Sequence, residues 1–312
     1  MSILGTSVNV GQRCLPASRP AAEANAFFRW ALRLKTALRW TLNSLHWLLQ
    51  ALLHFQPLSW CFLFILAIPC PLRAQNNYEI QVYGSETVAP GATMVEVHSN
   101  YTADGSKQPV DGVLPTNHAF HETLEITRGF TSWFETGFYV FSSAQNGHGW
   151  QWVGDHLRPR VRIPEDWHWP AGLSLSTEVG CQQRKFSTDT WNLELRPIID
   201  KQWGPFYVAI NPAFEKSLAG LNASRGFDFA PSGKACYNIT KIHGVGVTGG
   251  VEYYGDLGSA LDLDPVGQQQ HLIIPTLDLD LGPKWEFNFG IGVGVTRATD
   301  HLIVKMIVGR RF

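Results

Sequence analysis

The stretch between residues 285 and 295 constrains the fold most strongly, because its side chains alternate strictly in character. It reads Trp-Glu-Phe-Asn-Phe-Gly-Ile-Gly-Val-Gly-Val, with large apolar residues at one set of positions and charged, amide or glycine residues between them. A period of two is typical of an extended strand, whose successive side chains point to opposite faces. A soluble sandwich buries its apolar face, whereas a transmembrane barrel turns that face to lipid and its polar face inward.

Eleven further alternating runs, separated by Gly, Pro, Asn and Asp, favour the barrel. Runs of about 9–11 residues are long enough to cross a bilayer as tilted strands. An even number of strands allows a closed barrel whose two ends lie on the same side. The predicted fold is therefore an all-β, transmembrane, antiparallel up-and-down barrel. Its twelve strands are 94–101, 118–128, 133–141, 150–163, 173–181, 191–200, 206–215, 227–237, 245–254, 272–281, 285–295 and 302–312.

The connections between these runs alternate in length, as expected for short periplasmic turns and longer outer loops. Tryptophans lie near both sets of connections, which is typical of the aromatic belts at the two membrane interfaces. The short connections are 129–132, 164–170, 201–205, 238–244 and 282–284, and the tryptophans are Trp133, Trp150, Trp152, Trp167, Trp169, Trp191, Trp203 and Trp285. This pattern places the end of the last strand on the periplasmic side.

The last strand carries the most specific signal, since apolar residues alternate back from a final phenylalanine. These residues are Phe312, Val308, Met306, Val304 and Leu302. With the alternating strands and aromatic belts, residues 78–312 resemble a bacterial outer-membrane β-barrel protein of a porin-like or channel-like type. The resemblance implies outer-membrane lipid, periplasmic chaperones and the barrel-assembly machinery as partners, with the last strand as the assembly signal. Arg310 departs from that signal, and we expect its long side chain to reach the interface.

The first 74 residues have the order of a secretory signal: a basic region, an apolar core at about 58–69, and Ala74 before a polar segment. We expect cleavage after Ala74, a short periplasmic lead-in at 75–92 and the barrel at 93–312, exported to the bacterial outer membrane. The alternating run 78–83 is assigned to the lead-in. The alternative is an inner-membrane anchor at about 45–69, but polar residues and a proline interrupt that span.

Charge excludes one class of partner and indicates what the barrel encloses. Residues 75–312 contain 18 basic and 25 acidic residues, a net charge of −7, so nucleic acid is not an expected partner. Arg158, Arg160 and Arg162 alternate along one strand and form a predicted arginine ladder, with guanidinium groups about 7 Å apart. The other predicted lumen residues are Glu125, Glu135, Glu178, Glu194, Arg196, Asp278, Asp280 and Glu286, and further inward positions are Glu215, Lys234, Glu252, Lys305 and Arg311.

Two interpretations of this interior stay open. A water-filled lumen with arginines facing acids selects permeants by charge, whereas a narrow barrel filled by salt bridges is closed and only stabilised. The first predicts a passive channel for small polar or charged solutes. The second predicts a structural or adhesion barrel that acts through its outer loops. A membrane-embedded lipid hydrolase is a further alternative.

Catalytic and metal sites are not expected, and no cofactor is predicted. His98 and Ser99 are consecutive, so on a strand they point to opposite faces and cannot form a proton relay. His98, His118 and His121 with Glu122 are interpreted as ordinary rim residues, and the loop acids Asp256, Asp262 and Asp264 as a solvated acidic loop. Cys181 and Cys236 are predicted to lie on different faces of non-adjacent strands, without a disulfide.

Overall fold

The computed structural model describes residues 77–145 and 147–312. The predicted signal segment and its cleavage after Ala74 lie outside the described residues and stay predictions. Within the described part, no helix has the length and apolar character needed to cross a membrane. A short 3-10 helix, η2 (Glu165–Trp167), lies in the connection between the fourth and fifth strands of the described part.

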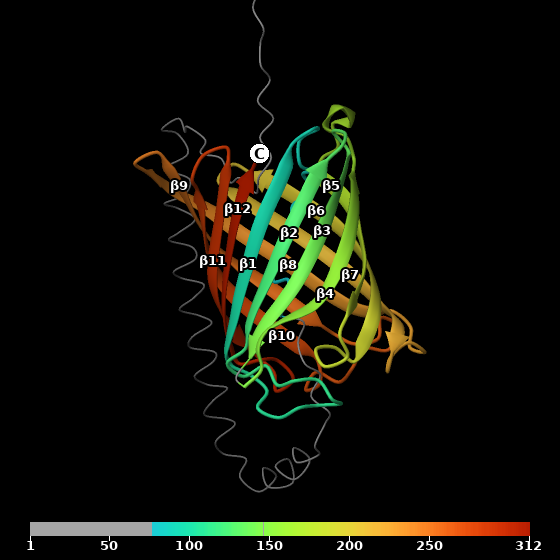
Figure 1. The fold of residues 1–312 in the computed structure, drawn as a ribbon. Helices are drawn as coiled ribbons and strands as arrows, with labels where there is room; N and C mark the ends of the chain where they lie inside the picture. Colours follow the sequence, from blue (N-terminus) through green and yellow to red (C-terminus); the bar gives the residue numbers. More distant parts are fainter. Residues whose placement is uncertain (1–76, 146) are drawn as a thin grey trace, which may run out of the picture. The chain divides into compact units, whose positions relative to one another are not determined.

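Twelve antiparallel strands close into one barrel, as Figure 1 shows. Each strand pairs with its neighbours in the sequence, and β12 pairs with β1 to complete the ring. The strands are β1 (Thr93–Asp104), β2 (Phe120–Gly129), β3 (Phe134–Gln145), β4 (Gly149–Arg162), β5 (Gly172–Gln182), β6 (Asp189–Trp203), β7 (Phe206–Gly220), β8 (Asp228–Ile242), β9 (Val245–Asp256), β10 (Gln270–Asp280), β11 (Trp285–Gly294) and β12 (Leu302–Arg311). The predicted fold and strand number are confirmed.

Burial along the strands shows which face each side chain occupies. In β2, Thr123 and Glu125 are buried, whereas Leu124 and Ile126 between them are 38% and 40% exposed. The same alternation on the other strands leaves large apolar side chains outside and puts carboxylates, arginines and lysines inside. A soluble protein has the opposite arrangement, because buried charges are costly unless they are paired.

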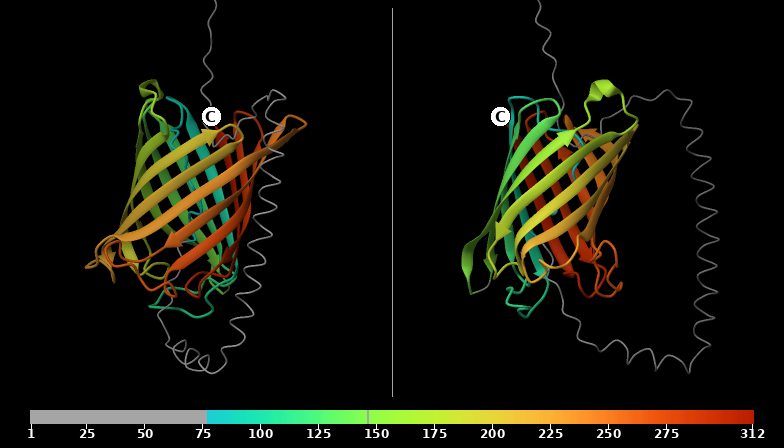
Figure 2. Two further views of the ribbon diagram at one scale, coloured as in Figure 1. Left: turned by 180° about the vertical axis from the view of Figure 1, so that it is seen from behind. Right: turned by 90° about the vertical axis from the view of Figure 1, so that its right-hand side faces the viewer.

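The two ends of the barrel differ in the length of their connections. Figure 2 shows the C-terminus at the same end as the short connections, which are 130–133, 163–171, 204–205, 243–244 and 281–284. We call this the short-turn end. The longest connections, 105–119 and 257–269, lie at the other end, the long-loop end. All eight tryptophans singled out from the sequence are exposed, between 41% and 63%, as aromatic belts require.

The seam between β1 and β12 is continuous to the short-turn end. Val97 pairs with Val308, and the backbones of Thr93 and Phe312 exchange two hydrogen bonds of 3.1 and 2.8 Å. Arg310, which departs from the apolar pattern, lies on the outer face with its guanidinium 5.1 Å from the Trp285 ring and 4.8 Å from the Phe312 ring. The aromatic rings therefore stabilise this charge at the barrel rim.

Candidate functional site

The interior of the barrel is crossed by the chain that precedes β1. We call residues 77–88 the plug segment. At the long-loop end, the Asn77 side chain donates hydrogen bonds to Thr102 (3.1 Å) and Asp300 (2.5 Å). At the short-turn end, the Val88 amide donates to a Glu135 carboxylate oxygen at 2.5 Å. The segment 75–92 was expected to be a periplasmic lead-in, but residues 77–88 lie inside the barrel instead, and Pro90 and Gly91 are exposed.

Apolar side chains of the plug segment explain this placement. Tyr78, Ile80 and Val82 are each at most 5% exposed, and each packs in a cluster with inward side chains of the barrel wall. Ile80, for example, packs in one cluster with Leu272, Ile274 and Ile303 of the wall. The alternating run 78–83 was therefore the signal for an internal element, although it pairs with no strand.

The backbone of the plug segment is bonded by side chains of the barrel wall. Buried backbone N–H and C=O groups need partners, and the strand pairings of the described residues do not include this segment. Asn211 on β7 accepts from the Tyr83 amide at 2.7 Å and donates to the Tyr83 carbonyl at 2.9 Å. Lys305 on β12 donates to the Ile80 carbonyl at 3.0 Å. Opposite walls of the barrel thus hold the segment in place.

The anchor at the long-loop end is a buried carboxylate. Asp300, in the loop between β11 and β12, accepts hydrogen bonds from the Asn77 side chain, from the Thr116 hydroxyl (2.6 Å) and from the Ser106 amide (3.2 Å). Burial raises the pKa of the Asp300 carboxyl, and the hydrogen bonds oppose that shift. Two outer loops and the plug segment therefore meet at this one side chain.

The predicted arginine ladder faces the interior of the barrel. Arg158 is 2% exposed and lies between Glu125 (2.5 Å) and Glu135 (3.6 Å), while Arg160 pairs with Glu135 at 2.6 Å. Arg162 lies at the short-turn rim and pairs with the exposed Glu165 at 3.1 Å. Each guanidinium group therefore has a carboxylate neighbour, which offsets the repulsion between successive arginines.

The ladder also contacts the plug segment. Arg160 donates to the carbonyls of Gly84 (3.1 Å) and Glu86 (2.6 Å). The guanidinium carbons of Arg158 and Arg196 lie 4.7 and 5.0 Å from the centre of the Tyr83 ring. Cations over an aromatic face are attracted to it, so Tyr83 sits among the positive charges of the lumen.

Around the arginine ladder, the remaining charges pair locally. Glu178 was expected beside the ladder, but it contacts His156 at 2.5 Å instead. Arg196 pairs with Glu194 on its own strand at 2.6 Å and with Glu79 of the plug segment at 3.3 Å.

On the opposite wall, acids pair with lysines. Lys234 contacts Asp278 at 2.8 Å and Glu252 at 3.4 Å, and Glu252 also pairs with Lys305. Asp278, a predicted lumen residue, lies on this wall with Lys234 and Asn288 as its neighbours.

The predicted lumen residues near the rim are less enclosed. Glu286 pairs with Arg311, and both line a cavity at the short-turn end. Asp280 is exposed at the end of β10 and lies beside a smaller cavity there. The structure thus places these residues at the mouth of the barrel, and a role for any predicted lumen residue in selecting solutes stays a prediction.

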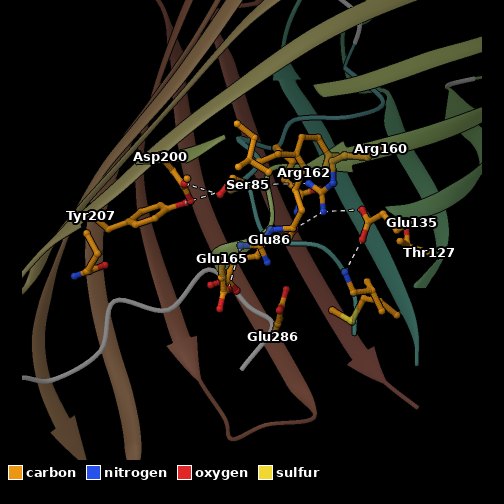
Figure 3. A pocket seen from close by; sticks show the side chains of 18 of the residues that line it. Ser85, Glu86, Thr127, Glu135, Arg160, Arg162, Glu165, Asp200, Tyr207 and Glu286 are labelled. Carbon is orange, nitrogen blue, oxygen red and sulfur yellow. Dashed lines mark hydrogen bonds and ion pairs between the residues drawn. The ribbon is translucent and has the colours of Figure 1, made fainter. Parts of the chain in front are cut away.

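Cavities lie on both sides of the plug segment. The larger, of about 370 Å³, opens toward the short-turn end and is lined by residues 83–86 of the plug segment and by the arginine ladder. Figure 3 shows Arg160 reaching Glu135 there, with Ser85 and Tyr207 both reaching Asp200. A second cavity of about 120 Å³ lies toward the long-loop end and is predominantly acidic: Glu79, Glu178, Glu194, Glu215 and Asp256 line it with Arg196.

Several residues of this site were missed by sequence reasoning. Asp200 accepts from the Ser85 hydroxyl at 2.7 Å and from the Tyr207 hydroxyl at 2.8 Å, and Asn211 holds Tyr83. Their inward parity on β6 and β7 was readable from the alternation. The plug segment, to which Asp200 and Asn211 bond, was not expected inside the barrel.

The histidines differ from the sequence interpretation in one respect. His118 is an exposed rim residue, but His98 and His121 are buried within the barrel. His98 and Ser99 do point to opposite faces, and the Ser99 hydroxyl donates to Glu122. Cys181 and Cys236 are not joined by a disulfide.

No family model and no curated protein matches this chain. Several solved structures are similar to it, among them the following three. The COG4313 outer membrane channel from Pseudomonas putida F1 shares 11% identity over 75% of this chain and 100% of that chain, with a TM-score of 0.48. The KdgM porin shares 11% identity (70% and 99%, TM-score 0.46), and the NanC porin shares 10% (69% and 97%, TM-score 0.43). The fold assignment itself rests on the strand pairing.

Proposed function

We propose that this protein is a bacterial outer-membrane channel for small polar or charged solutes, and that the plug segment holds it closed. The observation that supports a membrane location is the apolar outer face of a closed barrel, illustrated by Leu157, Ile210 and Ile291, which are 46%, 51% and 47% exposed. A polar interior and an apolar band outside are what a lipid bilayer requires of a barrel.

The support for a channel is the way in which the lumen is filled. Side-chain hydrogen bonds and ion pairs hold the plug segment, and no strand pairing includes it. Such contacts each contribute only about 0.5–1.5 kcal/mol net, so the segment can leave without unfolding the barrel. The arginine ladder and the acids of the long-loop cavity then line the exposed lumen and select solutes by charge.

Conductance across a planar lipid bilayer tests this proposal. Purified, refolded protein is compared with a variant that lacks residues 77–88. We expect rare, short openings for the complete chain and stable steps for the shortened one. A shortened barrel that migrates as a folded species on an unboiled gel and conducts no ions contradicts the channel proposal.

A closed structural or adhesion barrel is the second candidate, and the dense bonding of the plug segment favours it. Asn77, Ser85 and Val88 each bond to a different wall residue, namely Thr102, Asp200 and Glu135. This candidate predicts that the complete chain conducts no ions and that deletion of the plug segment destabilises the barrel without opening it. We propose no catalytic role, and lipid hydrolysis by the purified protein would overturn that assignment.

The proposed location implies the partners expected from the sequence. We propose export through a cleaved signal peptide, handling by periplasmic chaperones, insertion by the barrel-assembly machinery and outer-membrane lipid as the final surroundings. Protease treatment of intact cells, compared with lysed cells, tests the orientation: the long loops at 105–119 and 257–269 should be cut in intact cells, and the short turns only after lysis.

A further inference from the structure

Two buried carboxylates, Glu96 on β1 and Glu125 on β2, lie opposite each other on neighbouring strands. Glu96 and Glu125 are direct partners in the strand register, and their exposed fractions are 7% and 1%. Like charges directly opposite one another on a sheet repel, and burial makes the repulsion stronger. Among the described residues, the ion pairs of this cluster join Arg158 and Arg160 to Glu125 and Glu135, and none of these pairs includes Glu96.

A fully buried histidine lies beside this pair. His98 follows Glu96 by two residues on β1, so both side chains point into the lumen. Its Nε2 atom lies 3.4 Å from the Glu125 Oε2 atom, and neither atom meets the geometry of a hydrogen bond with another described residue. At 3.4 Å the two groups form an ion pair when His98 is protonated, and a buried imidazole and carboxylate oxygen without hydrogen bonds cost free energy unless a further group joins them.

We propose that Glu96, His98 and Glu125 bind a divalent transition metal ion such as Zn²⁺. One ligand atom from each residue lies within 4.8 Å of the others, and among the described residues this is the group of three with that geometry. Zinc bonds of about 2.0–2.1 Å in a tetrahedral arrangement separate two ligand atoms by about 3.3 Å. The observed 3.4 Å between His98 and Glu125 matches that separation.

The surroundings fit a metal ion in three ways. The second oxygen of Glu125 is held by Arg158 at 2.5 Å, which orients the carboxylate and leaves its other oxygen toward His98. Two carboxylates and one imidazole are a ligand set that zinc accepts, with a fourth position for water. Glu96 and Glu125 also line the cavity that opens at the short-turn end, which provides a path for the ion.

The metal site does not depend on the proposed channel, since a permanently closed barrel offers the same three ligands. It connects to the plug segment through Gln81, whose side-chain amide donates to Glu96 at 3.5 Å. A bound ion would link side chains of the paired strands β1 and β2 next to Gln81 of the plug segment.

Zinc binding by complete, untagged, refolded protein tests the proposal. After chelator treatment and its removal, the protein is titrated with Zn²⁺ in a calorimeter, and bound zinc is counted after gel filtration. The test variants are H98Q and E96Q. The control is H121Q, because His121 is also buried, 2% exposed, and without hydrogen bonds at its ring nitrogens. Unboiled gel migration verifies that each variant is folded.

We expect one zinc ion fewer per barrel, or an affinity lower by at least about tenfold, in H98Q and E96Q, and no change in H121Q. Equal binding by the wild type and H98Q overturns the proposal, as does equal loss in all three variants. The comparison also separates this site from the thiols of Cys181 and Cys236, which every variant retains.

A second measurement uses the wild type alone, in case the variants do not fold. Co²⁺ in place of Zn²⁺ absorbs visible light strongly in a four-coordinate site, and thiolate ligands add a charge-transfer band in the near ultraviolet. We expect the strong visible band without the thiolate band. A thiolate band, or a weak spectrum typical of hydrated cobalt, means that the three residues do not bind the metal and that His98 serves only as a proton-binding partner of Glu125.

Discussion

Asn211 holds the plug segment at Tyr83 by both backbone groups of that residue. Its side chain accepts from the Tyr83 amide and donates to the Tyr83 carbonyl, at 2.7 and 2.9 Å. A single amide side chain thus replaces the pair of hydrogen bonds that a neighbouring strand would supply. The plug segment is bonded like a strand at this point, and one wall residue supplies both bonds.

N211A should therefore open the channel more often. The substitution leaves two backbone groups of Tyr83 without partners, which costs about 1–3 kcal/mol each. We expect the open fraction in bilayer recordings to rise by roughly tenfold or more. The matched control is N192A, because the Asn192 side chain bonds only to the carbonyl of Asp189 at the long-loop end. An unchanged open fraction in N211A would argue against release of the plug segment as the opening step.

R160E should reverse the charge preference of the open lumen. In the variant that lacks residues 77–88, Arg160 faces solvent, and its replacement adds two negative charges in effect beside Glu135. We expect the reversal potential in a salt gradient to shift toward cations. R128E serves as control, since Arg128 is exposed on the outer side of β2. If both variants shift the potential equally, the arginine ladder does not line the conduction path.

A disulfide between the plug segment and the wall should lock the channel. The Ser85 hydroxyl contacts the Asp200 carboxylate at 2.7 Å, so S85C/D200C brings two thiols together. We expect oxidised protein to give no openings and reductant to restore them. The single variants S85C and D200C are the controls. Openings that persist in fully oxidised S85C/D200C would place the conduction path elsewhere.

F312A should lower the yield of assembled barrel in cells. The resemblance to outer-membrane proteins assigns Phe312 to the assembly signal, and the ring lies 66% exposed beside Arg310, where a receptor can reach it. The measurement is the amount of folded, heat-modifiable protein in outer membranes. F130A removes another exposed ring, on a connection at the same end, and should have no effect. Equal yields for F312A and wild type would refute the signal.

The alternation of apolar and polar residues along the strands was sufficient to predict the barrel fold. In β11 every second side chain is apolar, and lipid-facing and lumen-facing positions follow from parity alone. Parity also placed Arg158 and Arg160 inside. Pairing between inward side chains did not follow in the same way: Glu178 is adjacent to the strand of the ladder, yet it contacts His156, because side-chain length and direction choose among several near neighbours.

The position of the plug segment inside the barrel could not be predicted from the alternation of its residues. The run 78–83 alternates like a strand but is short, and single side chains from β7 and β12, which are distant in the sequence, bond its backbone. The cluster of Glu96, His98 and Glu125 was missed for a related reason. The sequence interpretation grouped His98 with the rim histidines. In the strand register His98 pairs with Thr123 on β2, and its side chain therefore lies next to Glu125.

The continuity of the plug segment with β1 has a consequence for how the barrel forms. The pairing of β1 with β12 joins residues at opposite ends of the barrel sequence, so it carries the greatest loop-closure entropy and is expected to form late. The plug segment turns back from β1 through residues 89–92, so it is already tethered to one edge of the open sheet. When β12 pairs with β1, the closing sheet encloses the plug segment, so the segment does not have to pass through a barrel that has already closed.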